Sequence, residues 1–295
     1  MTAGKLEIRT VALIGKYQSP EVAEALQPLA AFLRAQGIEV LIEEGTAAAG
    51  PGYSSPVASF DTIGMEADVA IVIGGDGTML HSARRLAEFE VPLVGINLGR
   101  LGFMTDISRN AMIDGVKDLL AGKFSAEQRF LLAAEVLRGG QRVFRTLAFN
   151  DVVVSKGDIG RMIELEVKVD GELLYVLRAD GMIVATPTGS TAYALSANGP
   201  ILNPAVPGIA LVPLCPHALS YRPITISDRS TVEFVLLAPH DGAAHFDGQA
   251  RFDTRAGDCV RIARASHAVT LLHPPGYSYF AMLREKLHWS ATPKH

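Results

Sequence analysis

Cysteine and clustered positive charge are scarce in this sequence. Only two of its 295 residues are cysteines, Cys215 and Cys259. So few cysteines exclude a disulfide framework and a thiolate metal site, and they favour a reducing compartment. The formal net charge is −4, and lysine and arginine form no cluster. Because surfaces that bind nucleic acid are basic, we expect no nucleic-acid partner.

Long apolar runs are missing as well. No run approaches the ~20 apolar residues that a membrane-spanning helix needs. The first nine residues lack the pattern of a signal peptide. We therefore expect a soluble, cytoplasmic protein without a membrane partner. Since 48% of the residues are hydrophobic and 20% are charged, the chain can bury a sizeable core, and its length favours two domains.

Strand and helix patterns alternate in the first part of the chain. Mostly apolar runs at residues 10–15, 38–43, 69–73 and 91–96 predict strands. Residues 19–36 predict a helix with Ser19 as N-cap and Pro20 at its first position. This alternation indicates a doubly wound, Rossmann-like α/β domain, in which ligands bind beyond the carboxyl ends of the strands. We assign it to residues 1–124, with a loop at 45–55.

After Gly122 the hydrophobic period changes from helical to alternating. Residues 130–137 with 143–149, and 162–169 with 172–177, predict hairpins. Further strands are predicted downstream, including one at 245–252. We therefore expect a mostly β domain over residues 125–275. Residues 276–295 form the tail, in which a helix at 278–287 carries Phe280, Leu283 and Leu287 on one face and is expected to pack on the N-terminal domain.

One glycine-rich loop follows the buried strand at 69–73, and its sequence is Gly74-Gly75-Asp76-Gly77. A helix pattern begins at once, with Thr78 as a plausible N-cap. Glycine amides and a helix N-terminus form an anion site. Asp76 would repel a phosphate unless it binds a metal or accepts a proton from a hydroxyl. The alternative is that Asp76-Gly77 is only a turn.

A second unusual stretch lies in the β domain. A strand runs into the turn Thr186-Pro187-Thr188-Gly189-Ser190-Thr191, and a short helix ended by Gly199-Pro200 follows. The turn has four hydroxyl residues where a helix cap uses one. Tyr193 comes directly after it and offers a flat surface for a base. We favour a ligand site here, and the alternative is an over-capped helix.

Several motifs, taken together and in order, carry a family resemblance. They are Gly74-Gly75-Asp76-Gly77-Thr78, Phe149-Asn150-Asp151, and Asp180-Gly181 followed by the turn at 186–193. This set resembles the NAD kinase family. Matches at 198–201, 216–217, 222–223 and 277–280 extend the resemblance over nearly the whole chain. The glycine-rich loop alone is weak evidence for this family, because lipid kinases and phosphofructokinases carry similar loops.

The resemblance implies roles for individual residues. Asp76 corresponds to the catalytic acidic residue beside the ribose 2′-hydroxyl, and Gly77 to a neighbour in the nucleotide site. The remaining positions correspond to contacts with the dinucleotide: Asn150, Asp151, Arg161, Arg178, Asp180, Thr191, Ala192, Tyr193, Ala194, Leu195, Ser196 and Gln249. Taken singly, these residues also fit structural roles. Asp180-Gly181 and Asp247-Gly248 are equally typical of hairpin turns, and Arg161 and Arg178 are equally typical of solvated strand residues. His217 and His245 are equally typical of histidines that are exposed or hydrogen-bonded within the fold.

The same resemblance implies an activity and an assembly. The expected reaction moves the γ-phosphate of ATP to the 2′-hydroxyl of the adenosine ribose of NAD and produces NADP and ADP. Mg²⁺, or another divalent ion, is expected to be bound with ATP. A homodimer or homotetramer built through the β domain is implied. The alternatives are another kinase with a Gly-Gly-Asp-Gly-Thr loop and a lipid or sugar acceptor, and a non-catalytic sensor of NAD or NADP.

Overall fold

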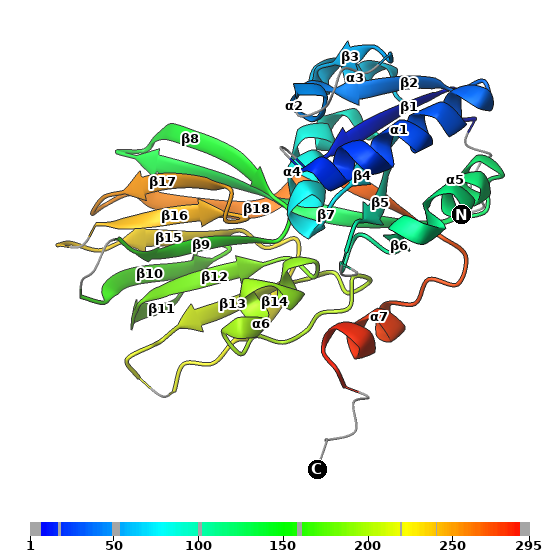
Figure 1. Ribbon diagram of the computed structural model, residues 1–295. Helices are drawn as coiled ribbons and strands as arrows, with labels where there is room; N and C mark the ends of the chain where they lie inside the picture. Colours follow the sequence, from blue (N-terminus) through cyan, green and yellow to red (C-terminus); the bar gives the residue numbers. More distant parts are fainter. Residues whose placement is uncertain are drawn as a thin grey trace. The chain divides into compact units, whose positions relative to one another are not determined.

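The computed structural model describes residues 7–16, 19–48, 54–99, 102–157, 161–218, 220–239 and 241–289. The chain divides into two compact units (Figure 1). The first, called the α/β unit, contains the residues up to Gln128 together with those from Ala268 onward. The second, called the β unit, contains Arg129–His267.

A parallel sheet forms the centre of the α/β unit. Its strands are β1 Thr10–Gly15, β2 Glu39–Glu43, β3 Val57–Ala58, β4 Val69–Ile73, β5 Leu93–Asn97 and β6 Ile107–Ser108. They pair in the order β3-β2-β1-β4-β5-β6, all parallel. The chain moves outward from β1 to β3 and then returns to β4 on the other side of β1. Ligands bind in the crevice at such a switch point, beyond the carboxyl ends of the strands.

Helices cover both faces of this sheet. The helices of the α/β unit are α1 Pro20–Ala35, α2 Glu44–Ala48, α3 Phe60–Glu66, α4 Asp76–Leu86, α5 Met112–Leu120 and α7 Tyr279–Lys286, with 3₁₀ turns at Ala87–Phe89 and Arg109–Ala111. Apolar residues of α1 and α5 share one core with alternate residues of the strands. Gly95 of β5 faces Met79 of α4 instead. The sheet is therefore doubly wound, and the predicted fold class is confirmed.

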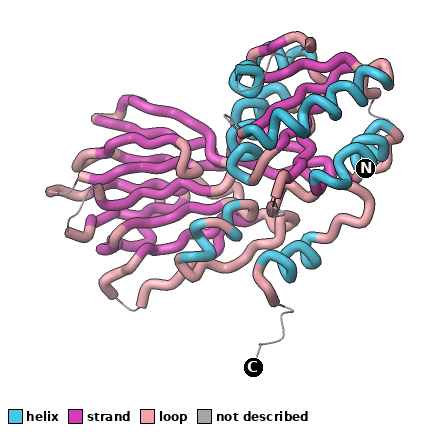
Figure 2. The backbone as a smooth tube through the Cα atoms, viewed as in Figure 1, coloured by secondary structure: helices cyan, strands magenta, loops and turns pink. Residues whose placement is uncertain are grey.

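The β unit is a sandwich of two antiparallel layers (Figure 2). One layer has the order β14-β13-β12-β9-β16-β17. Its strands are β9 Asp151–Lys156, β12 Gly181–Ala185, β13 Gly208–Leu214, β14 Ile224–Ser227, β16 Gly242–Phe246 and β17 Ala250–Thr254. The other contains β7 Ser125–Arg138, β8 Gln141–Ala148, β10 Ile163–Val169, β11 Glu172–Ala179, β15 Val232–Leu236 and the first part of β18 Cys259–His273.

Alternation along these strands produces two apolar faces on the first layer. Val152, Val154 and Val184 point into the core of the sandwich, whereas Val153 and Ile183 point outward. The outward residues are covered by a segment that contains the 3₁₀ turn Gly189–Thr191 and the short helix α6 Tyr193–Ser196, with Ala194 buried against them. This covering segment is the hydroxyl-rich stretch singled out in the sequence.

The structure corrects some predicted elements in the α/β unit. Residues 44–48 form α2 instead of a loop, because the Glu43 carboxylate accepts hydrogen bonds from Gly45 N and Thr46 N and caps the helix; positions 49–53 lie outside the described residues. The N-cap of α4 is Gly75 and not Thr78. In α7 the buried residues are Met282 and Leu283, while Phe280 is 62% exposed. Apolar spacing therefore identified Leu283 correctly but not Phe280.

A correction in the β unit concerns residues 245–252, which do not form one strand. They contain the end of β16, a turn at Asp247-Gly248, and the start of β17. Both turn residues have positive φ, 53° and 64°, which an Asp-Gly pair tolerates in a tight hairpin. The hairpin interpretation of this pair is confirmed.

Within the described residues, no helix is long and apolar enough to span a membrane.

A buried histidine joins distant segments of the α/β unit. His273 is 2% exposed, with Nδ1 2.7 Å from Asp106 Oδ2 and Nε2 3.1 Å from Glu127 Oε2. The Tyr277 ring stacks on the imidazole at a centroid distance of 3.7 Å. Burial lowers the pKa of His273, but hydrogen bonds to the two carboxylates raise it, and the resulting pKa lies above the ordinary value of 6.5. Protonated His273 therefore stabilises the folded unit.

We expect the α/β unit to lose stability as the pH rises through this raised pKa. Stabilisation by a histidine whose pKa is raised on folding is complete below the unfolded pKa and disappears as the folded state loses the proton. His273→Gln should make this pH dependence shallower and cost about 3 kcal/mol at acidic pH, since two carboxylates lose a buried cation. Thermal unfolding followed across neutral pH measures both effects. The control His267→Gln, in the same strand, should keep the wild-type slope; a wild-type slope in His273→Gln would contradict the prediction.

Candidate functional site

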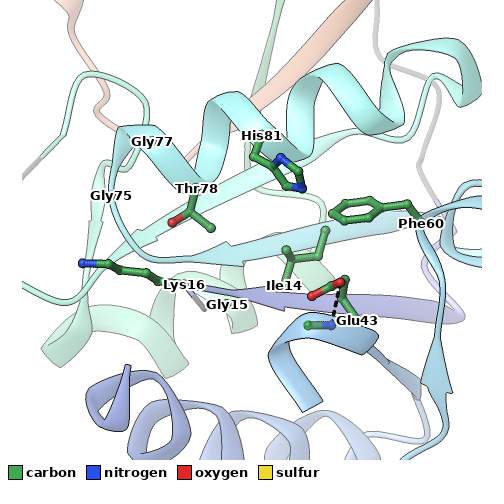
Figure 3. Close-up of a pocket in the computed structure, with 10 residues that line it drawn as sticks. Ile14, Gly15, Lys16, Glu43, Phe60, Gly75, Gly77, Thr78 and His81 are labelled. Atoms are coloured by element: carbon green, nitrogen blue, oxygen red, sulfur yellow. Dashed lines mark hydrogen bonds between the residues drawn. The ribbon is translucent and has the colours of Figure 1, made fainter. Parts of the chain in front are cut away.

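A pocket of about 590 Å³ opens at the switch point of the parallel sheet (Figure 3). We call it the glycine-turn pocket. It lies beyond the carboxyl ends of β1, β2 and β4, which supply Lys16, Glu43 and Gly75. Helix α4 contributes Gly77, Thr78 and His81, and α3 contributes Phe60. Its position is the one that the fold class predicts for a ligand.

The polar end of this pocket is suited to an anion. Gly75 caps α4 and has no side chain to accept hydrogen bonds from the first helical turn. The N-terminus of α4 therefore presents a positive dipole end that no side chain caps. The Lys16 ammonium adds a full positive charge, and Thr78 adds a hydroxyl donor on the same side of α4 (Figure 3). A phosphate group matches these donors.

The opposite end of the pocket is aromatic. His81 and Phe60 meet edge to face with ring centroids 5.4 Å apart, and the Arg85 guanidinium lies 5.0 Å from the Phe60 centroid. Burial lowers the pKa of His81, and the charges of Arg84 and Arg85 lower it further. A neutral imidazole beside a phenyl ring can contact a flat base and also hydrogen-bond to it. The pocket therefore offers a phosphate end and a base end.

Asp76 does not line the glycine-turn pocket. It is the first residue of α4, and its carboxylate accepts hydrogen bonds from two backbone amides of the segment after β5. Phe103 N lies 2.9 Å from Oδ2, and Met104 N lies 3.0 Å from Oδ1. A carboxylate has about four acceptor positions, so each oxygen keeps one for a further donor. Asp76 is therefore held in a fixed orientation and can still accept a proton.

A second pocket, of about 420 Å³, lies in the β unit. We call it the carboxyl-pair pocket, since Asp151 and Asp247 both line it. Asn150, Ala192 and Tyr193 line it as well. The Asn150 Oδ1 atom is buried and has no hydrogen-bond partner within the described part of the chain. Because buried acceptors normally have a hydrogen-bond donor, a ligand that binds in this pocket can supply one.

The two carboxyl groups of this pocket differ in their surroundings. Asp247 accepts hydrogen bonds from three consecutive amides, Phe149 N at 2.9 Å, Asn150 N at 2.7 Å and Asp151 N at 3.2 Å. Such bonds favour the ionised form. Asp151 is 5% exposed, and burial together with the charge of Asp247 raises its pKa to about 7. Around neutral pH, Asp151 therefore exchanges between a hydrogen-bond donor and a charged acceptor.

The hydroxyl-rich turn shapes this pocket from behind. Thr186 Oγ1 donates to Phe149 O and Ser190 Oγ donates to Pro187 O. Thr186 N also donates to Asn150 O at 2.9 Å. A side chain on Gly189 would overlap the Asn150 carbonyl, so the turn packs directly against the pocket wall. These hydroxyls hold the turn in place, while Tyr193, 49% exposed, presents its ring at the pocket.

Two family descriptions match this chain over most of its length. The ATP-NAD kinase N-terminal domain matches residues 11–124, and the ATP-NAD kinase C-terminal domain matches residues 149–273. The chain belongs to the NAD kinase family.

Named relatives agree with this assignment. A protein called NAD kinase from Azoarcus sp. strain BH72 is 63% identical over 288 residues, which are 97% of this chain and 98% of that protein. One from Aromatoleum aromaticum is 64% identical over 287 residues, covering 97% and 96%. One from Thiobacillus denitrificans is 50% identical over 285 residues, covering 97% and 98%.

Solved structures share the fold. Yeast NADH kinase complexed with NADH superposes with a TM-score of 0.89 at 23% identity, covering 98% of this chain and 90% of that chain. An NAD kinase from Archaeoglobus fulgidus in complex with ATP superposes with a TM-score of 0.75 at 24% identity, covering 95% and 98%. At identities of 23% and 24%, these superpositions show a shared fold and nothing more specific.

The structure gathers some of the residues that the NAD kinase resemblance singled out. Asn150, Asp151, Ala192 and Tyr193 line the carboxyl-pair pocket, and Gly77 lines the glycine-turn pocket. The others are not among the residues that line these two pockets: Asp76, Arg161, Arg178, Asp180, Thr191, Ala194, Leu195, Ser196 and Gln249.

The residues outside the two pockets have varied surroundings. Asp180 pairs with Lys156 at 2.8 Å, and Ala194 is fully buried. Arg161 and Arg178 are exposed, as expected of solvated residues. Gln249 follows the Asp247-Gly248 turn and is also exposed. The dinucleotide contacts assigned to these positions stay predictions.

Several pocket residues in this NAD kinase family member were not predicted from the sequence. Lys16, Phe60 and His81 belong to the glycine-turn pocket. Ser155, His245 and Asp247 belong to the carboxyl-pair pocket. Lys16 directly follows β1 and Asp247 directly follows β16, so a rule that marks the first polar residue after each strand would have found both. No group of three or more potential metal ligands is found within the described ranges.

Proposed function

We propose that this chain is an NAD kinase that transfers the γ-phosphate of ATP to the 2′-hydroxyl of the adenosine ribose of NAD. The observation that carries the proposal is the glycine-turn pocket, with a helix N-terminus, Lys16 and an aromatic end at the switch point of the sheet. A nucleoside triphosphate has both parts that this pocket accommodates. Membership of the NAD kinase family supports the same reaction.

The chemical step forms one bond and breaks another. The 2′-oxygen of the ribose attacks the γ-phosphorus, the bond from that phosphorus to the β–γ bridging oxygen breaks, and ADP leaves. The proton of the hydroxyl passes to Asp76. The divalent ion enters as part of the substrate, Mg·ATP, and neutralises charge on the phosphates. The protein then contributes positioning and electrostatic stabilisation, which dominate phosphoryl transfer.

The carboxyl-pair pocket is proposed to bind the adenosine part of NAD. The Tyr193 ring offers a stacking surface for the adenine. Asp151 and the Asn150 Oδ1 atom, which has no hydrogen-bond partner among the described residues, offer acceptors for the ribose hydroxyls or the adenine amino group. We further propose that Arg161, Arg178, Asp180, Thr191, Leu195, Ser196 and Gln249 contact the dinucleotide.

The proposed assembly is a homodimer or a homotetramer. Analytical sedimentation would measure its mass.

Incubation with NAD, ATP and Mg²⁺ tests the function directly. Formation of NADP, read by an NADP-specific dehydrogenase, supports the proposal. Binding of NAD without formation of NADP would identify a sensor instead. Consumption of ATP only with a lipid or a sugar present would identify a different kinase. An Asp76→Asn sample serves as the control for contaminating activity.

Lys16→Met should weaken the use of ATP. The ammonium is expected to contact the donor phosphates, and a hydrogen bond to a charged group contributes about 1.5–3 kcal/mol. Because Lys16 is exposed, we take the lower end, which predicts a KM for ATP raised about tenfold. The KM for NAD should stay near its wild-type value. Steady-state kinetics with each substrate varied in turn measures both constants.

A matched control exists for this variant. Lys117 lies on α5 and forms an exposed ion pair with Asp114 at 2.9 Å, outside the residues that line the glycine-turn pocket. Lys117→Met makes the same change in net charge and should leave both KM values unaltered. A Lys16→Met variant whose KM rises for NAD and not for ATP would reverse the assignment of the pocket.

A further inference from the structure

The segment after β5 makes a tight turn at residues 102–105. Gly102 N donates to Thr105 O at 3.3 Å. The same carbonyl accepts a hydrogen bond from Asn97 Nδ2 at 3.0 Å, and Asn97 Nδ2 also donates to Ile107 O at 3.3 Å. Asn97 is 3% exposed and Thr105 is fully buried. The turn is therefore fixed to the carboxyl end of β5 by a buried amide side chain.

The two amides inside this turn are those that hold Asp76. Phe103 N and Met104 N each donate to one oxygen of the carboxylate. Each bond is charge-assisted, and two of them define the plane of the carboxylate as well as its position. The Lys286 ammonium of α7 lies 5.8 Å from the Phe103 ring centroid and adds a contact to the segment.

Gly102 lies against the carboxylate so closely that no side chain fits. A Cβ atom added there would overlap both Asp76 Oδ1 and Thr105 Oγ1. The backbone at Gly102 does not adopt a positive φ. Glycine is therefore needed at this position because a side chain would overlap Asp76 and Thr105, and not because the backbone conformation requires it.

We infer that residues 102–104 are a positioning element for Asp76, and that Gly102 is required so that their amides can reach its carboxylate. This inference rests on the proposed function, in which Asp76 accepts the proton of the 2′-hydroxyl. The amides use one acceptor position on each oxygen and leave the remaining ones for the substrate. A base held in this way needs no reorientation during the reaction, and a misplacement of about 1 Å can cost about 10²-fold in rate.

Two glycines of the same segment provide the test. Gly102→Ala should lower kcat about 10- to 100-fold, because the new methyl group displaces the carboxylate or its amides. KM for ATP and KM for NAD should change less than about threefold, since neither pocket includes residue 102. The control is Gly99→Ala, where an added Cβ meets nothing within 4 Å. Gly99→Ala should keep wild-type kinetics, and a Gly102→Ala kcat above half of wild type would overturn the inference.

A double-mutant cycle separates positioning from general damage. If Gly102 acts through Asp76, then Gly102→Ala should have almost no further effect on kcat in an Asp76→Asn background. Independent effects would multiply, and a product of the two single reductions would overturn the inference. Thermal unfolding of all four proteins identifies any loss of the fold.

A third measurement does not depend on catalysis. In wild type, the amide hydrogens of Phe103 and Met104 should exchange slowly, and Asp76→Ala should make both exchange faster while the amides of β1 stay protected. Unchanged exchange at Phe103 and Met104 would overturn the inference even if the protein makes NADP. Slow exchange in a protein that makes no NADP would support the amide contacts and refute the proposed function.

Discussion

Asp76→Asn is expected to form NADP with kcat lowered about 10²- to 10⁴-fold, the usual contribution of general-base catalysis. An amide cannot accept the proton of the 2′-hydroxyl. KM for ATP and KM for NAD should remain close to wild type, because Asp76 lines neither pocket. The fold should persist, since the Asn oxygen can still accept one of the two backbone hydrogen bonds. Single-turnover kinetics would report the chemical step without product release.

A matched acidic residue serves as the control for this variant. Asp61 occupies the first turn of α3, as Asp76 does in α4. Asp61→Asn removes the same charge from a helix N-terminus and should leave kcat unchanged. If Asp76→Asn retains more than about a tenth of wild-type turnover, the loss is smaller than general-base catalysis provides, and Asp76 is not the base.

Local sequence signals predicted the framework of the site. The run at 69–73 is apolar and mostly β-branched and became β4, and the glycine turn after it opens α4 as expected. Pro20 at the start of α1 and Ser278 before α7 also mark helix starts that the structure contains. Signals of this kind are carried by residues that are neighbours in sequence, so a pattern can reveal them.

The contents of the pockets could not be read in the same way. Phe60, His81 and Lys16 line one pocket only because β1, β2 and β4 end at one edge of the sheet and α3 packs on α4. The helix α3 itself was not predicted. Likewise, Asp247 reaches the amides of residues 149–151 because β16 pairs with β9 in one register. The hydrogen bonds of Asp247 join residues 96 to 98 positions apart, and no local pattern contains them.

The structure also changes how the glycine turn is understood. The family resemblance suggested a carboxylate placed beside the ribose 2′-hydroxyl of the substrate. In the structure the carboxylate of Asp76 is held from one side by amides, while Gly77 and Thr78 line the pocket. One turn of α4 thus serves two roles, since its amides and hydroxyl suit phosphate and its acidic residue is kept apart. This arrangement resolves the repulsion expected between Asp76 and a phosphate in a single loop.

The carboxyl-pair pocket makes the β unit less stable above neutral pH. The pKa of Asp151 is about 7 in the folded protein against an ordinary value of 3.8. Between these values the folded chain holds a proton that the unfolded chain has lost. The stabilisation from this proton is complete below the unfolded pKa and disappears as the pH rises through about 7. The difference between these two pKa values corresponds to about 4 kcal/mol.

Asp151→Asn is therefore expected to stabilise the protein and to impair its function. Above neutral pH the variant should gain up to about 4 kcal/mol, because it carries no ionised carboxylate beside Asp247. KM for NAD should rise about 10- to 100-fold, as expected when charge-assisted hydrogen bonds worth about 1.5–3 kcal/mol are lost. KM for ATP should be unaffected. Thermal unfolding at acidic and alkaline pH, together with steady-state kinetics, measures these changes.

Asp253→Asn provides the comparison, since Asp253 lies on β17 of the same sheet with its side chain 77% exposed. That variant should show the wild-type dependence of stability on pH and the wild-type KM for NAD. If Asp151→Asn loses stability between acidic and alkaline pH as steeply as wild type does, the proton is not held by Asp151. If instead its stability rises but KM for NAD is unchanged, the carboxyl pair destabilises the β unit without contacting the dinucleotide, and the adenosine must bind elsewhere.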